Sequence, residues 1–181
     1  IAPPPARSEL VLRPAERVAR RQAADPIETL RDERARFRAL GRSVVFANGC
    51  FDILHPGHVT LLERARSEGD VLIVAINSDA SVKRLKGESR PVIPQNERAE
   101  ALLSLECVDR VLIYDDDTPL APIVALRPDV LVKGADWELD KIVGRAEVEA
   151  SGGRVVRVPL VKDRSTTALI RKAEGDGSSQ H

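Results

Sequence analysis

The 181-residue sequence contains no methionine, two cysteines and few aromatic side chains. Cys50 and Cys107 are far apart and form no Cys-x-x-Cys pair, which favours free thiols in a reducing compartment. Net charge is also missing, because lysine plus arginine equals aspartate plus glutamate at 28 each. No overall field attracts nucleic acid or an anionic membrane, so we expect neither as a partner. Any affinity for phosphate must be local.

Long apolar runs are absent as well. The longest, "VLIVAI" at residues 71–76, is far shorter than the about 20 residues that a membrane span needs. The first residues lack the apolar region of a secretory signal, so we expect a cytoplasmic protein. The chain opens on Ile1 instead of methionine, which leaves room for a longer parent chain.

Residues 1–41 differ in composition from the rest and are predicted to form an N-terminal helical extension. They begin with a proline-rich stretch and continue with a segment dense in arginine, glutamate and alanine. Asp25 is a good N-cap, followed by Pro26 at the first helical position and Glu28 at the third, and Gly41 ends the helix. We interpret its arginines as a solvated face, in preference to a contact with RNA or phosphate.

From residue 42 onward, apolar runs too continuous for a half-exposed sheet alternate with segments of helical spacing. This pattern predicts an α/β fold: a Rossmann-like, doubly wound, parallel five-stranded sheet over residues 42–173, followed by a disordered tail over 174–181. The strands are expected at 43–49, 70–77, 109–114, 128–134 and 153–160, and the helices at 57–69, 96–106, 119–126, 140–151 and 165–173.

The stretch "NGCFDILHPGH", residues 48–58, follows the first strand of this sheet. In doubly wound sheets, ligands bind beyond the carboxyl ends of the strands where the strand order reverses. His55 precedes the next helix and His58 lies in its first turn, so both imidazoles can face the amides at the helix start. Gly57 leaves no side chain in the way of a phosphate chain, and Asn48-Gly49 allows a sharp turn. The stretch therefore predicts an anion site.

The histidines admit two other interpretations, a metal site and packing in the core. The pair, with Asp52, could bind a metal, but the helical spacing best known for zinc is four and a third strong ligand is not evident. The rings could simply pack in the core, but two buried imidazoles would need several polar partners. We favour phosphate binding and predict no metal site formed by the protein.

Residues 48–58 resemble the HxGH signature of the nucleotidyltransferase superfamily. They are most similar to the D-glycero-β-D-manno-heptose 1-phosphate adenylyltransferases, which form the second half of bifunctional ADP-heptose synthases. The resemblance extends over about residues 42–172. It implies transfer of an adenylyl group from ATP to heptose 1-phosphate, giving ADP-heptose and pyrophosphate for lipopolysaccharide or other cell-surface heptose.

In that reaction, a phosphate oxygen attacks the α-phosphorus of ATP and needs no general base. Catalysis must stabilise charge on the phosphoryl group and on pyrophosphate, which fixed imidazoles, lysines and amides can do. The resemblance thus gives His55 and His58 the role of donors to phosphate oxygens. It also implies Mg²⁺ as cofactor, carried mainly by the triphosphate oxygens, with Asp52 contributing through water.

A basic segment, residues 77–98, follows the second strand, and its cations suit two anionic substrates. By resemblance, Lys83 or Lys86 bridges the reacting phosphates, and the residues leave open which one does. Arg90 would contact the acceptor phosphate and Arg98 the nucleotide, whereas Arg84 could equally lie on a solvated helix.

Two later motifs complete the resemblance. "VKGADW" resembles the element beside the nucleotide, with Ala135 in place of a second glycine, and its Trp137 could either stack near the site or pack elsewhere. "STT", at the start of the last predicted helix, resembles the triphosphate element. The residues predicted to bind the nucleotide are Asn48, Gly49, Cys50, Phe51, Asp52, Gly57, Arg98, Lys133, Gly134, Asp136, Ser165, Thr166 and Thr167.

Several alternatives stay open at this point. The acceptor could be glycerol 3-phosphate or phosphoethanolamine in a cytidylyltransferase, or FMN in another adenylyltransferase. A non-catalytic nucleotide-binding scaffold would use the arginine-rich segment as its partner arm. As partners we expect ATP and a sugar phosphate, a second copy in a homodimer, and a sugar kinase upstream in the same chain or separate from it.

Overall fold

The computed structural model describes residues 9–11 and 25–159. The predictions for the last helix, for Ser165, Thr166 and Thr167, and for the tail lie outside the described residues.

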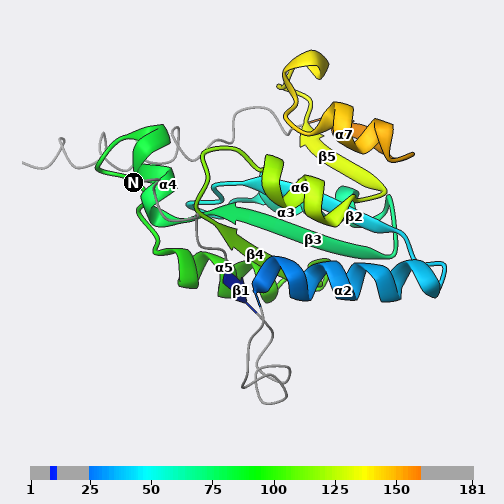
Figure 1. The fold of residues 1–181 in the computed structure, drawn as a ribbon. Helices are drawn as coiled ribbons and strands as arrows, with labels where there is room; N and C mark the ends of the chain where they lie inside the picture. The colour runs from blue at the N-terminus through cyan, green and yellow to red at the C-terminus, as the bar shows by residue number, and fades with distance from the viewer. Residues whose placement is uncertain (1–8, 12–24, 160–181) are drawn as a thin grey trace, which may run out of the picture.

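A six-stranded sheet with the order β1-β4-β3-β2-β5-β6 forms the centre of the molecule (Figure 1). The five predicted strands are confirmed and all parallel, whereas β1 runs antiparallel to β4 at one edge and was not predicted. Its three residues are too few to show a periodicity. The strands are β1 (Glu9–Val11), β2 (Val44–Gly49), β3 (Val71–Asn77), β4 (Arg110–Tyr114), β5 (Val130–Gly134) and β6 (Arg154–Val158).

Helices cover both faces of the sheet, which explains why its central strands are continuous apolar runs. All seven residues of β3 are buried. The buried side chains form two clusters, one beneath α3 and α5 and the other beneath α2, α6 and α7. The helices are α2 (Pro26–Ala39), α3 (Pro56–Arg66), α4 (Asp79–Lys86), α5 (Gln95–Leu103), α6 (Leu120–Leu126) and α7 (Arg145–Ala150), with a 3₁₀ turn η1 (Leu139–Lys141).

Helix α2 begins and ends as its sequence predicts. The Asp25 carboxylate accepts a hydrogen bond from the amide of Ile27, and Gly41 follows the helix with a φ of +68°, a conformation that glycine adopts without strain. Its packing was not predicted. Leu30 lies in the core cluster shared with α6 and α7, and Arg34 pairs with Asp129 at 2.7 Å. This helix is therefore built onto the sheet, and a separate role for residues 1–41 stays a prediction.

Replacing Leu30 with alanine is expected to lower the free energy of unfolding by about 2–5 kcal/mol, because Leu30 is 0% exposed and its removal leaves a cavity. Leu40, at the end of the same helix, is 72% exposed, so Leu40→Ala should change this free energy by less than about 0.5 kcal/mol. Chemical denaturation of both variants measures the difference. Equal effects would mean that α2 does not pack on the sheet in solution.

The strand order reverses beside β2. From β2 the chain passes through β3 to β4 on one side, then returns to β5 and β6 on the other. The carboxyl ends of β2 and β5 therefore flank the crevice where such sheets bind ligands. In Figure 1, the arrowheads of β3 and β4 point toward the end of the sheet where α4 lies.

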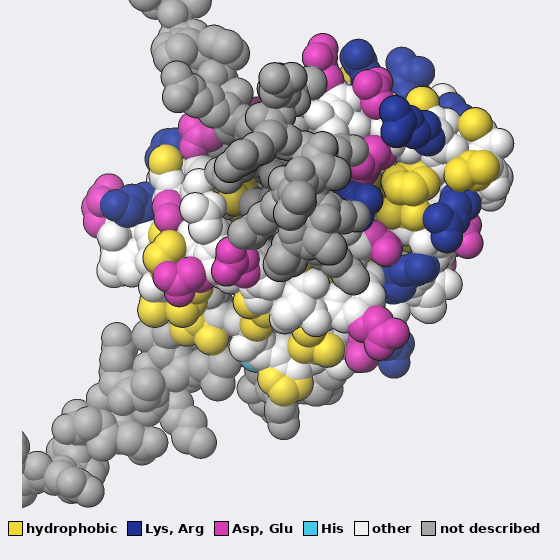
Figure 2. Space-filling model, turned by 90° about the horizontal axis from the view of Figure 1, so that it is seen from below, with side chains coloured by type: hydrophobic (Ala, Val, Ile, Leu, Met, Phe, Trp, Pro, Cys, Tyr) yellow, Lys and Arg dark blue, Asp and Glu magenta, His cyan; other side chains and the backbone are white. Residues whose placement is uncertain are grey.

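The described surface carries charges of both signs. Figure 2 shows lysine and arginine interspersed with aspartate and glutamate on the face seen from below, as the balanced composition leads us to expect. Within residues 9–11 and 25–159, no helix combines the length and the apolar character needed to cross a membrane.

Candidate active site

The two histidines lie together at the start of α3. His55 occupies the N-cap position in an extended conformation and makes no side-chain capping hydrogen bond, in contrast to Asp25 on α2 and Ser78 on α4. Its ring stacks on that of His58, with 3.8 Å between centroids and 23° between planes. The backbone amides of His58 and Val59 both donate to the carbonyl of His55. These two amides are therefore already paired within the chain.

The ring of His58 is held neutral at physiological pH. Burial lowers its pKa from 6.5 to about 4, and the charges of His55 and Lys86 act in the same direction, against a smaller opposing effect from the backbone of Ile53. The ring also packs against Phe51, with 5.0 Å between centroids. An anionic ligand would relieve this electrostatic cost, so the environment of His58 is suited to negative charge.

The depressed pKa of His58 predicts a pH-dependent stability. Between pH 6.5 and about 4, His58 is protonated in the unfolded chain but stays neutral in the folded chain. The free energy of unfolding therefore decreases as the pH falls through this range. We expect a loss of about 2 kcal/mol, less than the full pKa difference implies because the ring is partly exposed. Denaturation at a series of pH values should show it, and His58→Phe, which cannot titrate, should lose this component. An identical pH dependence in both proteins would contradict the assignment.

The carboxylate of Asp52 ties the first turn to the basic segment. It accepts hydrogen bonds from the amides of Val92 (2.7 Å) and Ile93 (3.0 Å) and pairs with the guanidinium of Arg90. The pKa of Asp52 is lowered by these hydrogen bonds although burial opposes them. Arg90 therefore has a protein partner here, and its predicted contact with the acceptor phosphate stays a prediction.

The structure also bears on Mg²⁺. Asp52 is 3% exposed and its oxygens already have three donors, which does not fit the predicted water-mediated contact with the metal. Among the described residues, no group of three histidine, cysteine, aspartate or glutamate side chains is arranged to hold a metal ion.

Arg98 was predicted to contact the nucleotide, but in the structure it points into the protein. It is 1% exposed and lies on α5. Its guanidinium donates to the carbonyls of Ile93 (2.9 Å), Cys50 (2.5 Å) and Asn77 (3.0 Å) and to the carboxylate of Asp79 (2.7 Å).

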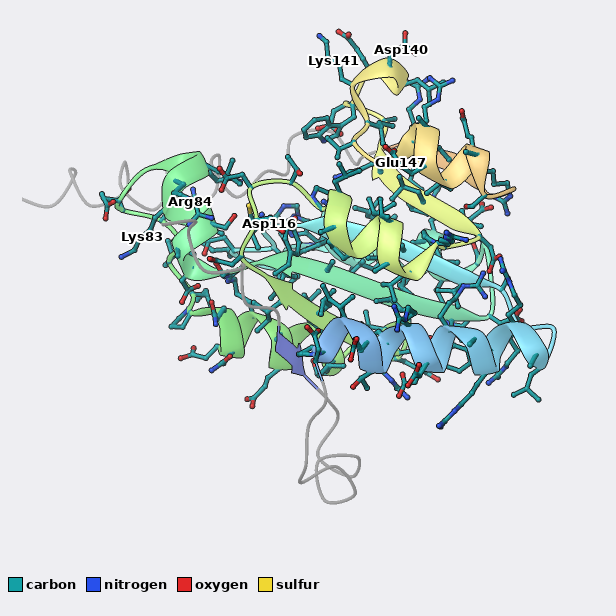
Figure 3. All side chains as sticks on the ribbon, in the orientation of Figure 1. Lys83, Arg84, Asp116, Asp140, Lys141 and Glu147 are labelled. Atoms are coloured by element: carbon teal, nitrogen blue, oxygen red, sulfur yellow. The ribbon has the colours of Figure 1, made fainter. Side chains whose placement is uncertain are left out.

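Helix α4 carries both candidate bridging lysines, Lys83 and Lys86, in its last turn, and both are exposed. The charge of Lys86 acts on the ring of His58. Lys83 is 49% exposed, lies 4.0 Å from Glu88 and points outward from α4 in Figure 3. Arg84 lies toward the loop that follows β4, where it pairs with Asp117 at 2.8 Å. Both lysines are exposed, so which of them bridges the phosphates stays a prediction.

Lys133 lies near the carboxyl end of β5, next to the end of β2. Its ammonium is 3.4 Å from the carbonyl of Asn48 and 5.1 Å from the ring centre of Trp137, which is 47% exposed. Burial lowers the pKa of Lys133 to about 8, opposed by the charge of Asp136. Ala135 has no positive φ, so its replacement of a family glycine causes no strain here. Lys133 and Asn48 thus meet where the prediction places the nucleotide.

A layer of buried polar side chains lies at the carboxyl ends of β3 and β4, and it was not predicted. Asn77 is the last residue of β3. Its side-chain amide donates a hydrogen bond to the hydroxyl of Ser81 at 3.0 Å, and the Asn77 side-chain oxygen accepts one from the thiol of Cys50 at 3.7 Å. Burial raises the pKa of Tyr114, which ends β4, to about 12, although hydrogen bonds with Asn48 and Asn77 oppose the shift. Polar residues closing apolar strands are the signal that could have identified this layer.

Comparisons with known proteins agree with the geometry. A family model described as cytidylyltransferase-like matches residues 46–172. The chain is 58% identical to the bifunctional protein HldE of Geobacter sulfurreducens over 135 residues, 75% of this chain and 28% of that protein. It is 54% identical to the bifunctional protein HldE of Citrifermentans bemidjiense over 138 residues, covering 76% and 28%. The chain thus spans less than a third of the length of these relatives.

Solved structures have the same fold. A lipopolysaccharide core biosynthesis protein from Thermoplasma volcanium is 28% identical, with a TM-score of 0.58 over 67% of this chain and 100% of that one. A pantoate-β-alanine ligase from Francisella tularensis has a TM-score of 0.54 at 17% identity, covering 83% of this chain and 76% of that one. The second likeness concerns the fold alone.

Proposed function

Because the chain belongs to the cytidylyltransferase-like family, we propose that it transfers the adenylyl group of ATP to D-glycero-β-D-manno-heptose 1-phosphate, giving ADP-heptose and pyrophosphate. The observation that carries this proposal is the stacked pair of His55 and His58 at the reversal point of the sheet. The identity to the bifunctional HldE proteins supports the choice of heptose.

In the proposed reaction, an oxygen of the sugar phosphate bonds to the α-phosphorus of ATP while the bond to the β-phosphate breaks. Pyrophosphate leaves with that bond's electrons, and no proton needs to be abstracted from the attacking phosphate. His55 and His58 donate hydrogen bonds to phosphate oxygens, and Lys86 offsets negative charge as the two anions approach. Mg²⁺ would accompany ATP on its triphosphate oxygens and contribute charge neutralisation there.

The partners follow from the same proposal. The HldE relatives are named bifunctional and are longer than this chain, which supports a sugar kinase either upstream in the parent chain or as a separate protein. A homodimer and a cytoplasmic location remain parts of the proposal.

Turnover measurements test the substrates directly. Pyrophosphate release is followed with ATP or CTP, each combined with heptose 1-phosphate, glycerol 3-phosphate, phosphoethanolamine or FMN. We expect turnover with ATP and heptose 1-phosphate. A strong preference for CTP would overturn the choice of base, and turnover with another acceptor the choice of heptose. If ATP binds and no acceptor yields pyrophosphate, the protein is a nucleotide-binding scaffold.

A further inference from the structure

Arg98 joins three segments that carry the proposed active site. Its acceptors are Cys50 beside the first turn, Asn77 and Asp79 at the junction of β3 and α4, and Ile93 in the loop that includes Arg90. Its side chain is 0% exposed. The guanidinium has several N–H donors in a rigid plane, so one side chain can hold these segments at fixed relative positions.

The contact with Cys50 has a specific consequence for the next residue. Phe51 has a φ of +46°, in the left-handed region that side chains other than glycine adopt only under strain. The residues on both sides of Phe51 are anchored: the carbonyl of Cys50 accepts from Arg98, and the carboxylate of Asp52 accepts from the amide of Ile93. The strained conformation is thus imposed by its neighbours.

This conformation sets where the ring of Phe51 lies. The ring approaches Gly49 so closely that a Cβ there would be 3.1 Å from it, and it packs against His58 at a tilt of 58°. His58 in turn stacks on His55. A continuous series of contacts therefore leads from the guanidinium to the two imidazoles.

We infer that Arg98 is a positioning residue: by holding the carbonyl of Cys50 it keeps Phe51 in its left-handed conformation, and Phe51 orients the imidazole of His58 toward the phosphates. This inference rests on the proposed function. It differs from a direct contact with the nucleotide, which would require the enclosed guanidinium to leave its four acceptors.

A second buried arginine provides a matched control. Arg34 is 6% exposed, pairs with Asp129 at 2.7 Å and donates to the carbonyl of Arg127. Asp129 lies just before β5 and also accepts a hydrogen bond from the amide of Val44, the first residue of β2. Both positions are at the amino ends of the strands, whereas the histidines follow the carboxyl end of β2. Arg34→Lys therefore makes the same chemical change at similar depth, away from the site.

The experiment compares Arg98→Lys with Arg34→Lys at a temperature where both are folded by circular dichroism. We expect Arg98→Lys to lower kcat by about 10²-fold, as misplacement of catalytic groups does, with a KM for ATP within about threefold of the original. Arg34→Lys should leave kcat per folded molecule unchanged. Equal losses of kcat in the two variants would mean a purely structural role, and a raised KM with unchanged kcat a direct contact; either overturns the inference.

A substrate-free measurement separates this inference from the proposed function. The pKa of His58, followed by NMR, should rise from about 4 toward 6.5 in Arg98→Lys and stay low in Arg34→Lys, because only the first frees the ring from its enclosure. An unchanged pKa in Arg98→Lys would overturn the inference even if the wild-type protein proved inactive. Absence of turnover in the wild type, with the expected NMR result, would overturn the proposed function alone.

Phe51→Leu keeps the test decisive if Arg98→Lys fails to fold. It leaves Arg98 and its acceptors in place and removes the aromatic contact with His58. The same fall in kcat with unchanged KM for ATP is expected. A wild-type kcat in folded Phe51→Leu would overturn the proposed route from Arg98 to the histidines.

Discussion

Replacing His58 with alanine is expected to lower kcat by about 10²–10³-fold, the usual effect of removing one preorganised donor to a developing negative charge. The affinity for ATP should change by only a few fold, because a contact that strengthens in the transition state affects kcat more than ground-state binding. Pyrophosphate release measures kcat, and calorimetry with ATP measures the affinity.

His58→Phe is the control that separates donation from packing. Phenylalanine can keep the ring contacts with Phe51 and His55 and has no N–H to donate. We expect His58→Phe to be as slow as His58→Ala. A wild-type kcat in either variant would refute the role of His58 as a donor, and recovery in His58→Phe alone would show that the ring matters for packing.

Replacing Lys86 with alanine is expected to lower kcat by about 10²-fold, because its charge acts at His58, where two anionic substrates must meet. Lys83→Ala should change kcat by less than about threefold, since the ammonium of Lys83 lies 4.0 Å from the carboxylate of Glu88.

The two lysine variants are matched, because both residues lie in the last turn of α4 and lose the same atoms. Assays of pyrophosphate release at equal ionic strength provide the comparison. The reverse order of effects would assign the bridging role to Lys83, and a wild-type kcat in both would remove α4 from the mechanism.

Local patterns predicted the features that depend on local physics. Strands buried on both faces must be apolar throughout, so the run at 71–76 was recognisable without knowing its neighbours. Asp25 caps α2 through its own backbone segment. The place of His55 at a helix start also follows from the chain direction and from the proline after it.

Helix α4 and strand β1 show where such patterns fail. Helix α4 has only eight residues and is highly charged, so it was not among the predicted helices. The three residues of β1 are held by pairing with β4, about a hundred positions later in the chain. Neither element shows enough apolar periodicity to be recognised before its partner is known.

The cationic side chains show the same limit in the site. The family resemblance predicts that Arg90 and Arg98 contact the substrates. In the structure, the carboxylate of Asp52, 38 positions before Arg90, and the carbonyl of Cys50, 48 positions before Arg98, accept hydrogen bonds from these side chains. The orientation of a long, flexible side chain depends on acceptors in distant segments of the chain. These acceptors cannot be identified from the residues next to it in the sequence.

The amino-acid sequence by itself determined the parallel strands, the capped start of α2 and the location of the histidines after the first strand, because each depends on neighbours within a few residues. Only the tertiary structure decided that Arg98 is turned inward to hold the backbone. Burial and hydrogen bonding act between segments brought together by the sheet, so the enclosure of Arg98 exists only once the chain has folded.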